Sequence, residues 1–402
     1  MTSPTKSSWH AVFASFLGWT LDAFDFFVVV FMFDTLAKHF GVDKKDIIFT
    51  TTATLALRPV GAVIFGLLAD RYGRRIPLIA NVLFFSLIEL LCGFAPSYTV
   101  FLILRALYGI GMGGEWGVGA SLAMEQAPPR WRGLLSGILQ SGYSIGYILA
   151  AIASRLILPH FSFDMGWRVM FWVGGLPALL ALYIRSSVPE SEAWKQHRVA
   201  DMKELLRTLG NHIPMMLSLM LMMTLFMFFS HGTQDLYPDF LKTVHRFSQA
   251  TVSNLAIFYN IGAVVGAMIF GMLSQRRGRR FAIVCAVALA LLAIPVWAFG
   301  PTLLTLAAGA FIMQMGVQGA WGVIPAHLNE LSPDSVRGLV PGLAYQLGIL
   351  FASGTNSIEY ALQHRFGYQW ALAGFETTVI VLLAIVVMFG REQHGKEFVV
   401  SE

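Results

Sequence analysis

The chain has 402 residues, of which 56% are hydrophobic and 13% are charged, and its net charge is +5. Soluble globular proteins carry about 25% charged residues, so this composition favours lipid over water as the main solvent and disfavours an ordinary soluble protein. The basic side chains lie in short clusters between apolar segments, which argues against a nucleic-acid partner. Cys92 and Cys285 lie inside apolar runs, so we expect neither a disulfide framework nor a metal site.

The first apolar run, about 11–35, is too long for the apolar core of a cleavable signal peptide and contains two aspartates, so it is expected to be a retained spanning helix. A spanning helix needs about 20 mostly apolar residues. Further runs of that length lie near 48–69, 76–95, 99–122, 133–157, 168–185, 213–238, 252–273, 281–299, 302–327, 338–361 and 369–390. The sequence therefore predicts an all-α membrane protein with twelve spans: an N-terminal half (1–186), a polar linker (187–212) and a C-terminal half (213–402).

The distribution of Lys and Arg predicts the orientation, because cytoplasmic loops are enriched in these residues. With a cytoplasmic N-terminus, eighteen lie inside: Lys6, Arg71, Arg74, Arg75, Arg130, Arg132, Arg185, Lys195, Arg198, Lys203, Arg207, Arg276, Arg277, Arg279, Arg280, Arg337, Arg391 and Lys396. Eight lie outside: Lys38, Lys44, Lys45, Arg155, Arg168, Lys242, Arg246 and Arg365. We therefore expect a multi-pass protein of the plasma or inner membrane with both termini in the cytoplasm.

Three motifs recur at one offset of 205 residues, the separation of Gly66 from Gly271. The loop Gly-Leu-Leu-Ala-Asp-Arg-Tyr-Gly-Arg-Arg at 66–75 returns at 271–280, and Glu-x-x-Pro-x-x-x-Arg-Gly at 125–133 returns at 330–338. Gly-Glu-Trp-Gly at 114–117 matches Gly-Ala-Trp-Gly at 319–322. This recurrence predicts two parallel six-helix halves related by an axis along the membrane normal.

The two loop motifs predict a gate at the inner face, because ion pairs between helix ends would close that side and break when it opens. Glycines in the motifs let helices approach closely. The residues expected to act in this gate are Gly66, Asp70, Arg71, Arg74, Arg75, Glu125, Arg132, Glu330 and Arg337. Gln275 replaces the aspartate in the second half, so a weaker latch is expected there. The alternative is that the arginines only set topology.

These motifs resemble those of a known family. The loop Gly-x-x-x-Asp-Arg-x-Gly-Arg-Arg at 66–75 resembles the signature of the major facilitator superfamily. Arg105-x-x-x-Gly109-x-Gly111 resembles its fourth-helix motif, and the resemblance covers nearly the whole chain. It implies a central cavity between the halves, alternating access by a rocking motion and, by default, a monomer.

Charged residues present in only one half are the candidates for substrate and coupling chemistry, because residues that serve the shared scaffold should recur in both. Residues of this kind, which stand opposite uncharged positions of the other half, include Asp22, Asp25, Arg58, Arg105, Glu115, His231 and Asp235. A charge at the bilayer centre costs at least about 2.5–3.5 kcal/mol, so buried charges indicate function.

Asp22, Asp25 and Arg58 are expected at a similar depth and form a candidate proton-coupled anion site. Arg58 would bind a substrate carboxylate through its planar guanidinium, and an aspartate would pair with it when the site is empty. The alternative is a permanent Asp–Arg pair that only fixes the first two spans. Glu115 is the candidate carrier of the coupled proton; alternatively, it pairs with Arg105 or a backbone group for structural reasons.

Residues 230–238, Ser-His-Gly-Thr-Gln-Asp-Leu-Tyr-Pro, end the seventh span with a concentrated set of polar groups. His231 and Asp235 are four residues apart on one helical face and could share a proton, the alternative being a solvated helix end. The segment resembles the seventh-helix signature of Jen-type lactate/pyruvate–proton symporters, in the sialate–proton symporter group, at Ser230, His231, Thr233, Gln234 and Asp235. It departs from that signature at Met227 and Asp239. The resemblance implies that His231 and Asp235 act in substrate recognition and proton coupling, with Gln234 in specificity.

Three further residues are weaker candidates. Asn356 is expected to contact substrate from the eleventh span, and Trp321 to supply an aromatic wall. Glu359 is expected at the membrane interface rather than in the site.

The leading hypothesis is import of a small organic anion, most of all a monocarboxylate such as lactate or pyruvate, together with a proton. The alternatives are a sialic-acid or aromatic-acid symporter, a drug:proton antiporter, and a sensor with a transporter fold. The sequence has no nucleophile arrangement, metal-ligand cluster or Walker-type loop, so neither an enzyme, an ATP-driven pump nor a cofactor is expected.

Overall fold

The computed structural model describes residues 5–197 and 202–399, and these are helical or in loops between helices. Residues 198–201 of the expected linker, Arg198 among them, lie outside the described residues. The helices of the N-terminal half are α1 (Lys6–Phe31), α2 (Phe33–Phe40), α3 (Lys44–Tyr72), α4 (Arg75–Cys92), α5 (Tyr98–Gln126), α6 (Arg132–Ile157), η1 (Leu158–His160), α7 (Phe163–Val173) and α8 (Ala178–Ser187).

Two short helices, α9 (Glu192–Gln196) and α10 (Met202–Asn211), follow in the linker region. The helices of the C-terminal half are α11 (Ile213–Gln234), α12 (Tyr237–Thr243), α13 (Gln249–Arg277), α14 (Arg279–Phe299), α15 (Leu303–Trp321), α16 (Ile324–Leu331), η2 (Asp334–Val336), α17 (Val340–Phe351), α18 (Thr355–Phe366) and α19 (Tyr368–Phe389).

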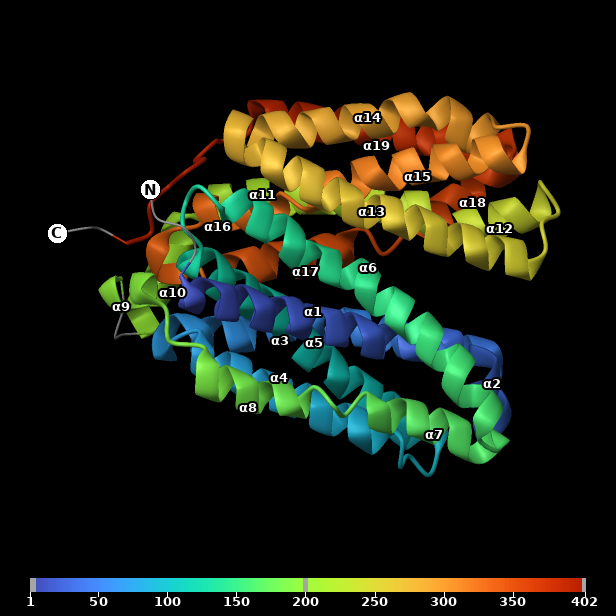
Figure 1. Ribbon diagram of the computed structural model, residues 1–402, viewed down its shortest axis with the longest axis horizontal. Helices are drawn as coiled ribbons and strands as arrows, with labels where there is room; N and C mark the ends of the chain where they lie inside the picture. The colour runs from blue at the N-terminus through green and yellow to red at the C-terminus, as the bar shows by residue number, and fades with distance from the viewer. Residues whose placement is uncertain (1–4, 198–201, 400–402) are drawn as a thin grey trace.

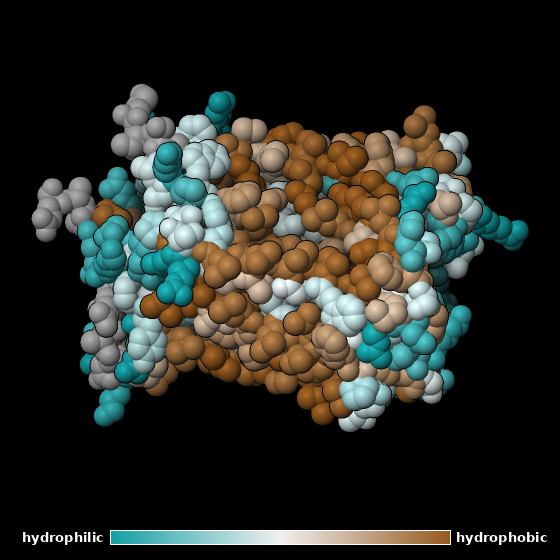
Figure 2. Space-filling model, turned by 60° about the horizontal axis from the view of Figure 1, so that its bottom comes forward, coloured by the Kyte–Doolittle hydropathy of each residue, from teal (hydrophilic) through white to brown (hydrophobic). Residues whose placement is uncertain are grey.

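The helices are long and apolar enough to span a membrane. Ten segments within the described residues meet both criteria by length and composition. Two further spans complete the expected twelve, although they do not meet the criteria. The helix α5 has 29 residues but carries buried charges, and the eleventh span is divided into two shorter helices, α17 and α18. Figure 2 shows the resulting belt of hydrophobic side chains between two hydrophilic ends. The predicted twelve-span all-α fold is confirmed.

The helices form two bundles that run side by side. In Figure 1, α13, α14, α15 and α19 lie together at the top, and α1, α3, α4 and α8 lie at the bottom. Both chain ends and the linker helices α9 and α10 lie at one end of the molecule, which we call the terminal side. The short helices α2 and α12 lie at the other end, which we call the opposite side.

The repeat seen in the sequence extends to backbone packing. A Cβ on Gly61 would lie 1.8 Å from the carbonyl oxygen of Ile110, which brings α3 and α5 into backbone contact. A Cβ on Gly266 would lie 2.0 Å from the carbonyl oxygen of Met315, the same contact 205 residues later between α13 and α15. Small residues therefore fix the same close helix pair in each half.

We expect Gly61→Ala to destabilise the protein, because the added methyl group meets a backbone oxygen that cannot move without separating two helices. Overpacking of this kind costs about 1–3 kcal/mol. The melting temperature in detergent should fall by several degrees. Gly374→Ala in α19 is the matched control, since no atom lies within 4 Å of its added Cβ. Equal melting temperatures for the two variants would contradict this account of the α3–α5 contact.

Candidate functional site

Arg58 lies midway along α3, and its side chain is buried, with the residue 3% exposed. Within the described residues it forms no salt bridge, and its Nε and Nη2 atoms have no hydrogen-bond partner. Its guanidinium carbon lies 5.8 Å from the centre of the Tyr345 ring, which belongs to α17 of the other half. Burying a charge without an ion-pair partner costs several kcal/mol, so a guanidinium in this position is chemically able to accept an anionic partner.

Asp22 and Glu115 are the acidic neighbours of Arg58, and both feel its charge. Tyr108 donates a hydrogen bond to Asp22 Oδ1 at 3.0 Å. Neither carboxylate oxygen of Glu115 has a hydrogen-bond partner in the described structure. A Cβ on Gly18 would lie 2.2 Å from Glu115 Oε1, so the carboxyl group rests on a glycine of α1.

The expected meeting of Asp25 with Arg58 does not occur. Asp25 instead lies beside Glu89 of α4, where a Cβ on Gly174 would lie 2.5 Å from Asp25 Oδ1 and 2.8 Å from Glu89 Cγ. Glu89 forms a 2.6 Å ion pair with Arg105. Glu89 was not among the predicted site residues, and it takes Arg105 as a partner in place of Glu115, the partner considered from the sequence.

Negative charge is in excess at this depth of the N-terminal half. Four buried carboxyl groups share two buried guanidinium groups, the members being Asp22, Asp25, Glu89, Glu115, Arg58 and Arg105. Ionised groups without counter-charges are costly in a low-dielectric interior, so proton binding to some of these carboxyl groups is the inexpensive way to balance the cluster.

His231 in the last turn of α11 and Asp235, which caps the end of that helix, form the pair expected from their spacing, with His231 Nδ1 and Asp235 Oδ2 3.1 Å apart. Asn356 of α18 donates to the same carboxylate oxygen at 3.2 Å. The His231 and Asp235 side chains remain 33% and 35% accessible. The charge of Arg58 acts on His231, and that of Asp235 acts on Tyr143 of α6.

Gln234 and Trp321, two further predicted site residues, both contact other side chains of the protein. Gln234 Nε2 donates to Gln314 Oε1 at 2.8 Å, so its amide is engaged with α15. Trp321 is 3% exposed and packs against Tyr345 at 5.5 Å between ring centres. Trp321 is one of a cluster of aromatic rings contributed by both halves: Trp19, Trp116, Tyr143, Phe226, Trp321 and Tyr345.

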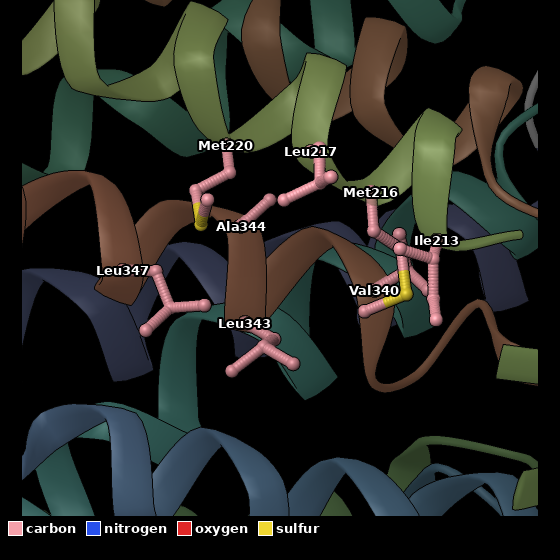
Figure 3. A pocket seen from close by; sticks show the side chains of 8 residues that line it. All are labelled: Ile213, Met216, Leu217, Met220, Val340, Leu343, Ala344 and Leu347. Carbon is pink, nitrogen blue, oxygen red and sulfur yellow. The ribbon is translucent and has the colours of Figure 1, made fainter. Parts of the chain in front are cut away.

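A separate pocket lies at the seam between α11 and α17 (Figure 3). Its lining is entirely apolar: Ile213, Met216, Leu217, Met220, Val340, Leu343, Ala344 and Leu347. With no hydrogen-bond donor or cation among these side chains, this pocket does not suit an anion, and the polar groups around Arg58 and His231 remain the candidate site.

The terminal side is closed by a buried network between the halves. Asp70 accepts hydrogen bonds from the backbone N–H groups of Gly338 at 2.7 Å and Leu339 at 3.0 Å. Arg74 binds Asp70 at 2.7 Å and Glu125 at 2.9 Å. Asp70, itself bound by Arg74, thus holds a loop of the second half.

Other predicted gate residues join the network. Glu125 contacts Arg337 of the other half at 3.4 Å, and Glu330 contacts Arg132 of the other half at 3.0 Å. A Cβ on Gly66 would lie 2.7 Å from the Cα atom of Leu339, so the glycine permits this closure.

Arg71 and Arg75 lie outside this network. The guanidinium of Arg71 lies 5.2 Å from the Tyr72 ring, and that of Arg75 binds the carbonyl oxygen of Arg185. Gln275 occupies the place of Asp70 in the second half. It accepts a hydrogen bond from the backbone N–H of Gly133 at 2.9 Å and donates one to the carbonyl oxygen of Pro129 at 2.7 Å. The neutral amide thus makes two hydrogen bonds to the first half, and the weaker latch expected from the loss of the charge stays a prediction.

The C-terminal segment adds an unpredicted contact to this closure. Phe398 is 3% exposed, and its ring centre lies 3.8 Å from the guanidinium carbon of Arg132 and 3.9 Å from that of Arg337. Lys396 Nζ lies 2.9 Å from Asp334. Partial burial alone would raise the pKa of Asp334, but Arg337 and Lys396 outweigh it and hold that pKa below its usual value. The segment therefore binds arginines from both halves.

The sequence model for sugar (and other) transporters matches residues 10–214 and again residues 210–393. The chain belongs to the sugar (and other) transporter family. Its two matches meet in the linker region, as expected for a transporter of two similar halves.

Curated relatives of this transporter carry metabolite-transport names. It is 30% identical over 395 residues to the carboxylic acid transporter protein homolog of Saccharomyces cerevisiae, covering 92% of this chain but only 64% of that protein. It is 30% identical to the probable 4-methylmuconolactone transporter of Cupriavidus pinatubonensis, covering 95% of this chain and 90% of the relative. It is 27% identical to the sialic acid transporter NanX of Escherichia coli, covering 97% and 96%.

Solved structures show the same fold. The proton:xylose symporter XylE of the major facilitator superfamily superimposes with a TM-score of 0.75 at 18% identity, covering 98% of each chain. The human organic anion transporter MFSD10 gives a TM-score of 0.74 at 16% identity, covering 94% of this chain and 99% of that one. The transporter therefore has the major facilitator fold.

We expect Phe398→Ala to open the terminal side of the transporter more often. Two cation–π contacts of about 0.5–1 kcal/mol each would be lost, which corresponds to about a 5- to 30-fold change in the closed-to-open ratio. The measurement is the rate of maleimide labelling at position 69 in an Ala69→Cys background, because Ala69 is 0% exposed beside Asp70. Val399→Ala, which truncates an exposed apolar neighbour, is the control. Equal labelling rates for both variants would contradict a role for Phe398 in the closure.

Proposed function

We propose that this transporter imports a small organic anion together with a proton, and that the anion is a monocarboxylate of the lactate or pyruvate kind. The observation that carries the proposal is Arg58, a buried guanidinium with no salt bridge in the described structure and free Nε and Nη2 donors. A guanidinium binds a carboxylate through two parallel hydrogen bonds, which gives it both affinity and orientation.

The surrounding carboxyl groups supply the reason for proton coupling. The cluster already holds more acidic than basic groups, so an incoming anion adds to an existing negative excess. Protonation of Glu115 or Asp22 releases Arg58 from its acidic neighbours and leaves its positive charge for the substrate. Proton binding and anion binding then favour each other, which is the thermodynamic basis of symport.

The closed network at the terminal side supports an alternating-access cycle. We assign the terminal side to the cytoplasm, because the clusters of Lys and Arg lie there. The structure then corresponds to a state closed to the cytoplasm, in which the partly accessible His231 and Asp235 receive substrate from outside. Separation of Asp70 from the 338–339 backbone would open the cytoplasmic side and release anion and proton together.

The names of two relatives, a carboxylic acid transporter homolog and a sialic acid transporter, agree with an acidic substrate. A sialic acid or an aromatic acid is therefore the second candidate. Competition between these acids and lactate for transport distinguishes the two candidates.

Uptake of labelled L-lactate into proteoliposomes with an inward proton gradient tests the proposal. We expect uptake that is saturable, absent from protein-free vesicles and abolished by a protonophore. Unlabelled pyruvate, sialic acid and benzoate then rank the substrates by competition. Failure of every acid to enter in response to the proton gradient would exclude the proposed symport.

A further inference from the structure

Two buried acidic residues of the C-terminal half have no role in the function proposed above. Glu359 of α18 is 1% exposed and Glu376 of α19 is 0% exposed. None of their four carboxyl oxygens has a hydrogen-bond partner within residues 5–197 and 202–399. Glu359 is thus packed inside the helix bundle, and its expected depth at the membrane interface stays a prediction.

Glu376 contacts α11 inside the polar segment that contains His231. A Cβ on Gly232 would lie 2.1 Å from Glu376 Oε1, so any larger residue at position 232 would collide with the carboxyl group. The glycine therefore gives Glu376 access to the helix backbone next to His231. Glu115 rests on Gly18 in the same way in the N-terminal half, with a corresponding distance of 2.2 Å.

The acidic groups form a series that leads from Asp235 into the bundle. The charge of Asp235 acts on Glu359, and the charge of Glu359 acts on Glu376. Asn356, which binds Asp235, lies one turn before Glu359 on α18. The series therefore begins at Asp235, whose side chain is 35% accessible, and ends at Glu376, which is fully buried.

No cation offsets this series in the helices packed against α19. His231 is the basic group of α11 in this region, and it pairs with Asp235. The arginines of α14 are engaged at the terminal side, Arg279 with Glu330 and Arg280 with the carbonyl oxygen of Val387. Val387 lies eleven residues beyond Glu376, about 16 Å along the helix. The other ionisable side chains of α14 and α18 are Cys285, Tyr360, His364 and Arg365.

An ionised carboxylate with neither counter-charge nor hydrogen bond is unstable in a protein interior within a membrane, whereas the protonated acid is neutral. We propose that Glu376, together with Glu359, is a second proton-binding site of the transporter, separate from the Arg58 cluster and adjacent to the His231–Asp235 pair. The inference rests on the proposed proton-coupled function and adds a proton that crosses with each substrate through the C-terminal half.

The step requires no co-reactant. A proton from water on the opposite side reaches Asp235, passes to Glu359 and forms the O–H bond of Glu376. In the state open to the terminal side this O–H bond breaks, and the proton leaves to water there. One carboxyl group is protonated and deprotonated in each cycle, so charge and atoms balance.

Substrate accumulation at a fixed proton gradient tests the second site. With the membrane potential clamped at zero, each coupled proton multiplies the maximum accumulation of the anion by ten per pH unit. We expect Glu376→Gln, which mimics the protonated acid, to lower lactate accumulation about tenfold at a gradient of one pH unit. Glu359→Gln should give the same loss, and Glu204→Gln in the exposed part of α10 should match the wild type.

Exchange of labelled for unlabelled lactate without a gradient separates coupling from folding. Exchange needs no net proton movement, so both glutamine variants should retain it. Wild-type accumulation by Glu376→Gln, or loss of exchange together with accumulation, would overturn the second site while leaving the symport proposal standing. Absence of proton-driven accumulation of any tested acid by the wild type would instead overturn the symport proposal and the second site with it.

Discussion

Arg58→Ala is expected to reduce L-lactate uptake by at least about 30-fold. Removing one partner of a buried charged hydrogen-bonded pair costs about 2–5 kcal/mol, and tenfold corresponds to about 1.4 kcal/mol. The guanidinium forms no salt bridge with a described residue. Its removal therefore breaks no direct ion pair with a buried carboxylate of the protein. The loss should therefore appear in transport rather than in folding.

Two variants sharpen this test. Arg58→Lys keeps the charge but not the planar fork, and we expect it to recover only part of the uptake. Arg155→Ala removes an exposed arginine at the end of α6 and should leave uptake unchanged. Wild-type uptake by Arg58→Ala protein with a normal melting temperature would show that Arg58 does not bind the substrate.

Glu115→Gln is expected to remove the contribution of the Arg58 cluster to proton-driven lactate accumulation. The exchange of labelled for unlabelled lactate should be preserved. The glutamine keeps the shape that rests on Gly18 but cannot gain or lose a proton. At a gradient of one pH unit, the loss of one coupled proton lowers accumulation about tenfold. The assay compares lactate accumulation and gradient-free exchange in the same vesicles.

Glu204→Gln on the exposed linker helix provides the control for Glu115→Gln, as it removes a carboxylate far from the cluster. If Glu115→Gln accumulates lactate as the wild type does, the coupled proton of this cluster belongs to Asp22 or to one of the other acidic groups.

The sequence predicted the span count and the closure of the terminal side, because both depend on local patterns. Apolar length determines the spans, and the repeated loop motifs place Asp70, Arg74 and Glu125 where they can meet. The contact of Phe398 had no such signal. It follows the last span by nine residues, and an aromatic ring in a polar tail does not reveal that two arginines will enclose it.

Depth along a helix was predictable, but rotation about its axis was not. Counting residues placed Asp22, Asp25 and Arg58 at one level, whereas the structure brings only Asp22 near Arg58. Asp25 lies with Glu89 instead, because packing of α1, mainly against α6 and α5, fixes the rotation of that helix. Such contacts join segments far apart in the chain, and periodicity within one helix does not determine them.

Two buried glutamates outside the predicted site also lack a charged counterpart in the other half. Glu89 stands opposite Ile294 and Glu376 opposite Phe171 at the offset of 205 residues, so the same rule would have identified both. For Glu89, the ion pair with Arg105 explains why the other half has no charged residue at the corresponding position.

The central claim is that an organic anion and a proton cross together, and direct observation of the proton tests it best. Proteoliposomes without a pre-formed gradient would contain a pH-sensitive dye, and L-lactate would be added outside with the membrane potential clamped. The account predicts acidification of the interior beyond that of protein-free vesicles, and its loss in Arg58→Ala. An interior pH no different from that of protein-free vesicles, or an alkaline shift as in an antiporter, would contradict it.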